Sequence, residues 1–275
     1  MNTPLIDRLY QKYRIAHLSY GTIHDKLGDV YEEFLTLVLQ DPNNLVAFCT
    51  NHPLNTLEYR IFEKIMRIAG ISPNNKLLSI SATTTVPHRS SGGNAKTDVI
   101  ATLHFGNSQN IVIPISSKQT TVAKVAMAEF DVDTICREMA ITNTRLKQLL
   151  LKHQIDCSAT NFTSAEKTEL TALLRPIARD FVRWVITGSK FKNPSDVVFP
   201  TMIIKHHLNK PANRFNVDVS NGDFEHISFE VYTVEQYIDT IMYTKTGNIK
   251  SGGFGTGLSW TYATGSAGKK IQFKG

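Results

Sequence analysis

Two apolar, β-branched runs joined by a short polar segment constrain the fold of this 275-residue chain more than any other feature. The runs cover residues 98–105 and 110–118, and Gly106-Asn107-Ser108-Gln109 between them has the composition of a turn. The pattern predicts a β-hairpin. If the turn is centred near residues 107 and 108, cross-strand partners have numbers that sum to about 215, so Asp98 lies opposite residues 116 to 118.

The predicted register brings three polar side chains to one end of the hairpin. Side chains alternate between faces along a strand, so Ser116 and Lys118 share one face, and an even register sum puts Asp98 on it too. Such a group suits phosphodiester hydrolysis, in which a carboxylate holds Mg²⁺, the metal lowers the pKa of a water, and a lysine orients that water or offsets negative charge. A solvated Asp–Lys ion pair is the alternative interpretation, because this short spacing is common.

The remaining periodicities predict an α/β chain. Apolar stripes at helical spacing occupy residues 27–38 and 57–66, further helices are expected at 133–139 and 145–152, and Thr163-x-x-Glu166 reads as a capping box that opens a long helix through Trp184. Other strands are expected at 77–80, 198–206 and 226–231. Because no internal repeat or long linker divides the chain, we expect a single domain over 1–275. It would have a mainly helical part at 1–75, a catalytic hairpin region at 76–130 and an integral arm at 240–275.

The C-terminal arm is basic and rich in glycine. No acidic residue follows Asp239, whereas five of the chain's lysines and 8 of its 16 glycines do. Apolar and polar side chains alternate over 258–262 and 271–274, which predicts two half-buried strands around a turn at 265–268 rather than a mobile terminus. With 30 Lys and Arg against 24 Asp and Glu, the chain carries a net charge of +6, and this arm is the segment best suited to phosphate contacts.

Composition argues against several other classes of protein. A hydrophobic content of 41% is enough for a sizeable core, no apolar run approaches the roughly 18 residues of a membrane helix, and the first residues lack a secretion signal. The three cysteines form no C-x-x-C pair, so neither a disulfide framework nor a zinc cluster is indicated. We therefore expect a soluble intracellular protein with no membrane partner.

Several long segments resemble a known family. They are Gly92-Gly93-Asn94-Ala95-Lys96-Thr97-Asp98, residues 128–136, Arg183-Trp184, and residues 253–266 and 270–275 of the arm. On these segments the chain resembles the MspI-like type II restriction endonucleases of the PD-(D/E)xK nuclease superfamily. The resemblance implies a restriction-endonuclease-like α/β core, with a central mixed β-sheet flanked by helices and a basic C-terminal DNA-binding arm. It also implies Mg²⁺-dependent cutting of double-stranded DNA at 5′-CCGG after the first cytosine, in the prokaryotic cytoplasm and paired with a DNA methyltransferase.

The resemblance assigns roles to the polar residues of the hairpin. Asp98 would be the principal metal ligand, and Lys118 would lie beside the attacking water. Ser116 departs from the pattern that the resemblance implies, because most of the superfamily has Asp or Glu there and MspI-like sequences have Asn. A hydroxyl is a neutral, shorter ligand that would hold a metal through a water. Glu32, on the helix expected at 27–38, is of the type that some superfamily members add to the site; the alternative is a solvated helix glutamate.

The resemblance places DNA contacts on the segment after Lys118 and on the arm. Lysine can donate to guanine O6 and N7, while glutamine and threonine offer shorter donor and acceptor groups in the major groove. The expected base-reading or DNA-facing residues are Lys274, Gln272, Thr261, Thr264 and Tyr262, and the expected phosphate contacts are Lys269, Lys270 and Ser266. Ala126 stands where a polar residue is expected in the family.

Two other functions stay open at the level of sequence. Ser116 in place of an acidic or amide ligand would suit a DNA-binding protein that has kept the fold and lost catalysis. A nuclease acting on damaged or structured DNA is the third hypothesis. The sequence indicates no oligomeric state.

Overall fold

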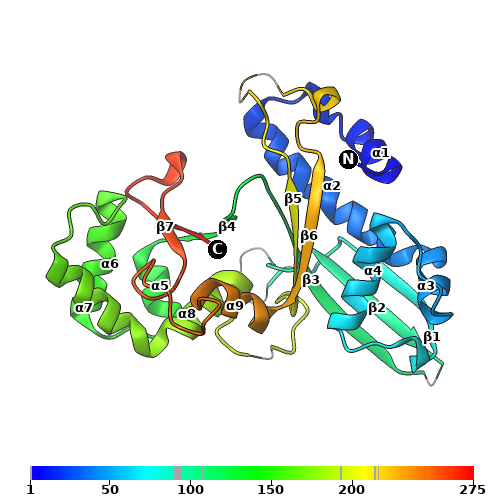
Figure 1. The fold of residues 1–275 in the computed structure, drawn as a ribbon. Helices are drawn as coiled ribbons and strands as arrows, with labels where there is room; N and C mark the ends of the chain where they lie inside the picture. The colour runs from blue at the N-terminus through cyan, green and yellow to red at the C-terminus, as the bar shows by residue number, and fades with distance from the viewer. Residues whose placement is uncertain (1, 90–94, 107, 193, 214, 216) are drawn as a thin grey trace. The chain divides into compact units, whose positions relative to one another are not determined.

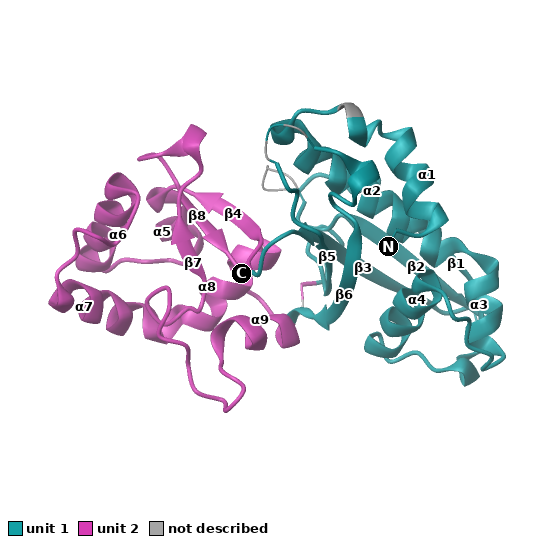
Figure 2. Cartoon of the chain, turned by 45° about the horizontal axis from the view of Figure 1, so that its top comes forward, with its two compact units in different colours: residues 1–123, 195–234 teal, residues 124–194, 235–275 magenta. Residues whose placement is uncertain are grey.

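The computed structural model describes residues 2–89, 95–106, 108–192, 194–213, 215 and 217–275 (Figure 1). The chain forms two compact units (Figure 2): unit 1 comprises residues 1–123 and 195–234, and unit 2 comprises residues 124–194 and 235–275. Each unit combines two separate stretches of chain. The single domain over 1–275, with the parts expected from the sequence, stays a prediction. Residues 92–94 of the family-like segment and Asn107 of the turn lie outside the described residues.

A five-stranded mixed sheet forms the centre of unit 1. Its strand order is β1-β2-β3-β5-β6, with β3 and β5 parallel and the other neighbours antiparallel. This confirms the central mixed sheet expected from the sequence. The strands are β1 (Leu77–Thr83), β2 (Val99–Phe105), β3 (Asn110–Thr120), β5 (Met202–Leu208) and β6 (His226–Thr233).

Helices cover the sheet of unit 1 with their apolar stripes. In α2 the buried residues recur three and four apart, and the helix packs on β1, β2 and β3, while α4 packs on β6 and on α2 (Figure 1). The helices are α1 (Pro4–Lys12), α2 (Tyr20–Gln40), α3 (Pro42–Cys49) and α4 (Leu57–Ile68), with 3₁₀ turns at Ile15–His17, Pro73–Asn75 and Val219–Asn221. Because α2 crosses three strands of the sheet, some of its polar residues also lie near the sheet.

The hairpin register follows the sequence prediction. Val99 pairs with Ile115, and the backbone N–H of Asp98 donates to the carbonyl of Ile115 at 2.8 Å, so Asp98 lies beside Ser116 just before β2 begins. Val99 and Ile115 are fully buried, which fixes the register because a slip of one residue would turn both toward the opposite face.

Unit 2 contains a smaller antiparallel sheet and its own core. The strand order is β4-β8-β7, and the turn at 265–268 separates β7 from β8 as predicted. Aromatic side chains fill one side of this sheet, where the rings of Phe130 and Trp184 stack at 4.1 Å. The strands are β4 (Ala126–Phe130), β7 (Ser259–Thr261) and β8 (Ile271–Lys274); the helices are α5 (Val132–Glu138), α6 (Thr144–Asp156), α7 (Ser164–Leu174), α8 (Ala178–Thr187) and α9 (Val234–Met242), with 3₁₀ turns at Arg175–Ile177 and Thr264–Ser266.

Three expectations about local structure need correction. The capping box of Thr163 and Glu166 is present, but the helix it opens ends at Leu174, because Pro176 lacks the N–H that a continuous helix needs. Strand β5 begins at Met202 rather than at residue 198, after Pro200. The strand expected at 258–262 is shorter, so that Tyr262 lies beyond β7 and is 46% exposed. Among the described residues, no helix has both the length and the apolar character required to span a membrane.

Candidate active site and nucleic-acid interface

The end of the hairpin in unit 1 gathers three donors around one oxygen of Asp98. The Ser116 hydroxyl and the Ser117 backbone N–H each donate to Oδ2 at 2.8 Å, and Lys118 Nζ donates at 2.9 Å. The Asp98 and Lys118 side chains are only 19% and 22% exposed, so this is not the solvated surface ion pair that the sequence left open. The cluster is a fixed, half-buried carboxylate with a cation beside it.

Glu32 lies on α2, within electrostatic reach of this cluster. Its neighbour Tyr31 is buried, and its ring centroid lies 4.7 Å from that of His206 in β5 with the planes tilted by 31°, which packs this turn of the helix against the sheet. Burial and, to a lesser degree, the charge of Asp98 raise the pKa of the Glu32 carboxyl to about 7, against the opposing charge of Lys118. A glutamate surrounded by solvent would not show this burial-driven rise in pKa. Glu32 also lines a pocket of about 310 Å³ with Asp29, Glu33 and other residues of unit 1.

Lys96 is a basic residue near the cluster to which sequence reasoning assigned no role. Burial and, to a lesser degree, the charge of Lys118 lower the pKa of its ammonium group to about 8, against the opposing charge of Asp98. Its backbone N–H donates to the carbonyl of Val198 at 3.1 Å, which ties the approach to Asp98 to the segment before β5. Only its position two residues before Asp98 could have pointed to it in the sequence.

The donor set of the cluster fits a divalent cation of the Mg²⁺ type. Mg²⁺ binds through one or two carboxylates and keeps several waters, and Asp98 and Glu32 are two carboxylates within electrostatic reach of each other. Among the described residues no group of three His, Cys, Asp or Glu side chains is arranged to hold a metal ion. The ring nitrogens of the buried His206 and His226 lie 3.3 Å apart. Asp98 and Glu32 would therefore hold the cation with water completing its shell.

The sheet of unit 2 has one apolar and one polar face. Ile271 and Phe273 of β8 are fully buried, so Gln272 and Lys274 point to the opposite face. Directly opposed residues share a face, which makes two rows across the strands. The first row is Glu129, Gln272 and Thr261, and the second is Ala126, Lys274 and Ser259.

Glu129 connects two of the predicted DNA contacts on this polar face. Its Oε1 accepts from Gln272 Nε2 at 2.7 Å, and its Oε2 accepts from the Ser266 hydroxyl at 2.9 Å. In the second row, Lys124 Nζ donates to the Ser259 hydroxyl at 2.9 Å. Sequence reasoning gave no role to Glu129 or Lys124. The pairing of β4 with β8 brings Glu129 beside Gln272, and nothing in the local sequence of β4 indicates that pairing.

The other predicted DNA contacts lie at the end of β7 and in the turn that follows. Tyr262, Thr264, Lys269 and Lys270 are exposed, and Thr264 begins a 3₁₀ turn that ends at Ser266. All eight predicted DNA-contacting residues thus belong to unit 2, whereas Asp98, Ser116, Lys118 and Glu32 belong to unit 1.

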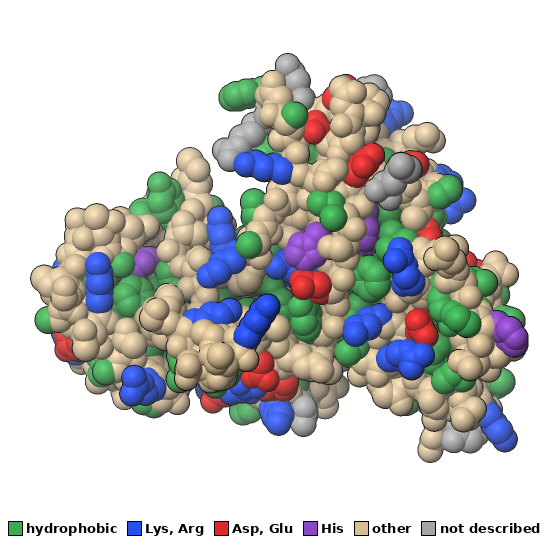
Figure 3. Space-filling model, in the orientation of Figure 1, with side chains coloured by type: hydrophobic (Ala, Val, Ile, Leu, Met, Phe, Trp, Pro, Cys, Tyr) green, Lys and Arg blue, Asp and Glu red, His purple; other side chains and the backbone are tan. Residues whose placement is uncertain are grey.

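The two units differ sharply in net charge. Unit 2 contains 16 Lys and Arg against 10 Asp and Glu, which gives +6, and unit 1 contains 14 of each, which gives zero. Basic side chains occur on the visible surfaces of both units, but in unit 1 acidic ones balance them (Figure 3). The net positive charge of the chain is therefore carried entirely by the unit with the predicted DNA contacts.

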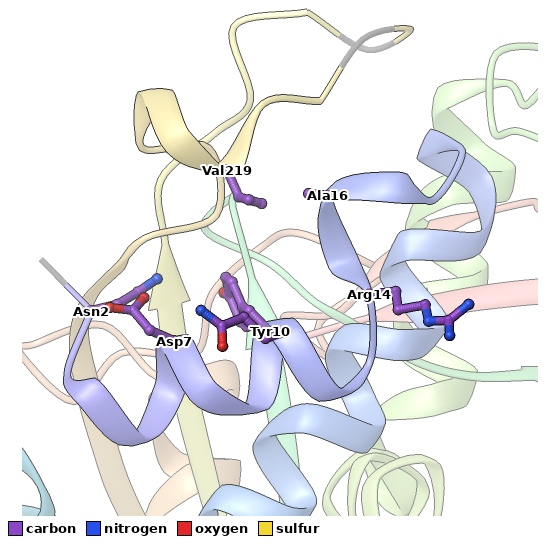
Figure 4. Close-up of a pocket in the computed structure, with 7 residues that line it drawn as sticks. Asn2, Asp7, Tyr10, Arg14, Ala16 and Val219 are labelled. Atoms are coloured by element: carbon purple, nitrogen blue, oxygen red, sulfur yellow. The ribbon is translucent and has the colours of Figure 1, made fainter.

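A larger pocket of unit 1 holds none of these residues. It has a volume of about 650 Å³ and lies along α1, where Asn2, Tyr10 and Arg14 are among its lining residues (Figure 4). The Tyr10 hydroxyl donates to the carbonyl of Phe224 at 2.7 Å, so this tyrosine already serves the packing of α1. We assign the pocket no part in the chemistry.

Comparison with known proteins gives similarities that cover most or all of the chain. Residues 12–275 match the model of the family described as restriction endonuclease MspI. The chain is 32% identical over 278 residues to the type II restriction enzyme MspI of Moraxella sp, covering all of both proteins. It is 22% identical over 264 residues to the type II restriction enzyme BsuFI of Bacillus subtilis, covering 94% of this chain and 61% of that one. The crystal structure of restriction endonuclease MspI in complex with its cognate DNA matches with a TM-score of 0.83, at 32% identity and full coverage of both chains.

Proposed function

Because the chain belongs to the MspI family of type II restriction endonucleases, and is thus a site-specific deoxyribonuclease, we propose that it makes Mg²⁺-dependent double-strand cuts in DNA at 5′-CCGG, after the first cytosine. The observation that carries the proposal is the cluster at Asp98, where Ser116, Ser117 and Lys118 all donate to one carboxylate oxygen. An intact carboxylate with a lysine beside it argues for a working hydrolase rather than a protein that only binds DNA.

Each side chain of the cluster has a distinct part in the proposed hydrolysis. A bound Mg²⁺ supplies a Lewis acid that polarises the scissile phosphate and makes a water easier to deprotonate. Asp98 and Glu32 would hold the cation, and Lys118 would place a positive charge near the phosphate, where negative charge develops as water bonds to phosphorus and the ester oxygen leaves. Ser116 acts through Asp98, because its hydroxyl proton is directed at Oδ2.

The polar face of unit 2 is proposed to read the target. Lys274, Gln272, Thr261 and Thr264 would contact base edges in the major groove, with Tyr262 beside them. Lys269, Lys270 and Ser266 are assigned to phosphates, which position the protein without specifying sequence. The net charge of +6 on unit 2 supports placing the DNA contacts there, since phosphate contacts dominate DNA affinity.

A DNA methyltransferase of matching specificity is the proposed functional partner. An endonuclease that cuts a short palindrome would also cut the DNA of its own cell, unless that target is modified. Digestion of one plasmid prepared with and without modification of its CCGG sites would test this pairing, and equal cutting of both preparations would count against it.

Incubation of the purified protein with plasmid DNA and Mg²⁺ tests the proposed activity directly. Discrete fragments whose ends map to CCGG, absent with Asp98→Ala, are the expected result. Retardation of the plasmid without cutting would instead favour a DNA-binding protein that has lost catalysis. Nicking without regard to sequence would favour a nuclease for damaged or structured DNA.

A further inference from the structure

Glu129 is a carboxylate on a face that is otherwise suited to DNA. Phosphates are repelled by a negative charge, and in the described residues no lysine or arginine forms an ion pair with Glu129. If Gln272 and Ser266 only needed an acceptor to hold them, a neutral glutamine would serve without the repulsion. We therefore expect the negative charge of Glu129 to have a further partner that is a strong hydrogen-bond donor.

The hydrogen bonds of Glu129 leave acceptor capacity on both of its oxygens. An ionised carboxylate offers about four lone-pair sites. Gln272 uses one on Oε1 and Ser266 uses one on Oε2, so each oxygen can accept one more hydrogen bond. The two donors also fix the carboxylate in one orientation on the half-exposed face, which lowers the entropic cost of a further contact.

In the major groove the donors available to a carboxylate are the exocyclic amino groups of bases. The proposed target contains cytosine and guanine only, and cytosine N4 is the amino group that those bases present in the major groove. We propose that Glu129 is a specificity-determining residue that accepts a hydrogen bond from the N4 amino group of a cytosine in the target. Gln272 and Ser266 hold it for that contact. This role rests on the proposed function.

The test measures binding to duplexes that differ by one amino group. Each cytosine of CCGG is replaced in turn by 2-pyrimidinone, which lacks the 4-amino group, and affinities are measured in Ca²⁺ in place of Mg²⁺. The wild-type protein should bind one of these duplexes roughly 10- to 100-fold more weakly than CCGG, the range for a hydrogen bond to a charged group. Glu129→Ala should bind CCGG more weakly and show no further loss on that duplex.

Two variants control for folding and for charge. Glu129→Gln keeps the size of the side chain and a carbonyl acceptor, so it should retain part of the discrimination. Glu138→Gln removes a carboxylate at the end of α5, also in unit 2, and should keep the full wild-type ratio between the duplexes. Because each result is a ratio for one preparation, a partly folded sample does not alter it.

The possible outcomes distinguish a failure of the role proposed for Glu129 from a failure of the proposed CCGG target. If the wild-type protein discriminates and Glu129→Ala retains the same ratio at both cytosines, Glu129 only positions its neighbours and the proposed role is wrong. If the wild-type protein binds CCGG no better than a scrambled duplex, the proposed target fails and this role fails with it.

Discussion

Ser116 is where the candidate active site can be tested most sharply. Its side chain is 1% exposed, and its hydroxyl is one of three donors to Asp98 Oδ2. Replacement by alanine removes that donor while the Ser117 N–H and Lys118 still hold the carboxylate. A hydrogen bond to a charged group contributes roughly 1.5–3 kcal/mol. If that amount is lost from the transition state, the cleavage rate falls roughly 10- to 100-fold.

The assay is single-turnover cleavage of a CCGG duplex over a Mg²⁺ titration. Ser116→Ala should retain measurable cutting, whereas Asp98→Ala should have none while still binding DNA in Ca²⁺. Ser117→Ala is the matched control, because the buried Ser117 hydroxyl has no hydrogen-bond partner among the described residues and the mutation preserves the backbone N–H that reaches Asp98. A Ser116→Ala protein as inactive as Asp98→Ala would refute the reasoning and make Ser116 a direct metal ligand.

The reverse substitution at the same position probes the cation itself. Ser116→Asp would put a second carboxylate about where the hydroxyl now lies, 2.8 Å from Asp98 Oδ2. Without a cation this repulsion should lower the free energy of unfolding by roughly 1–4 kcal/mol, the range for charges about 4 Å apart in water and near a protein surface. Mg²⁺ should restore stability more in Ser116→Asp than in wild type. Equal Mg²⁺ effects on the two melting temperatures would contradict a metal at Asp98.

Lysine and histidine side chains carry the remaining predictions. Lys118→Ala should slow single-turnover cleavage roughly 10²- to 10⁴-fold, and near-normal cutting would remove this lysine from the site. Alanine at Lys269 or Lys270 should weaken binding to all duplexes and reduce the salt slope by about one, whereas Lys274→Ala should cost roughly 1–3 kcal/mol on cognate DNA; equal losses on cognate and scrambled duplexes would refute base reading by Lys274. Burial lowers the pKa of His153 to about 4, so the unfolded chain binds its proton first as the pH falls from 6.5. The stability that His153 contributes above pH 6.5 should therefore decrease by up to about 3 kcal/mol by pH 4. In urea unfolding followed by tryptophan fluorescence, His153→Phe should lose less stability over this range than wild type, and an identical pH profile would contradict the assignment.

Much of the catalytic cluster could be predicted from the sequence because its contacts are local. Asp98 and Lys118 are 20 residues apart on one hairpin, and the alternation of apolar side chains together with the turn specifies the register. The same kind of signal placed α2 and the strands of the arm. The helix predicted to run from the Thr163–Glu166 capping box through Trp184 was too long. Pro176 interrupts it, and this stop signal is itself local.

Only the tertiary structure decided which distant residues share a site. Glu32 meets the hairpin because α2 crosses β1, β2 and β3, and Glu129 meets Gln272 across 143 residues because β4 pairs with β8. The positive charge of the arm is visible in the sequence. That the whole net charge of +6 falls in unit 2 depends on the packing of residues 124–194 with residues 235–275. Propensity and periodicity act through neighbours a few residues away. The pairing of remote segments depends on which buried faces fit each other, and this is a property of the whole folded chain.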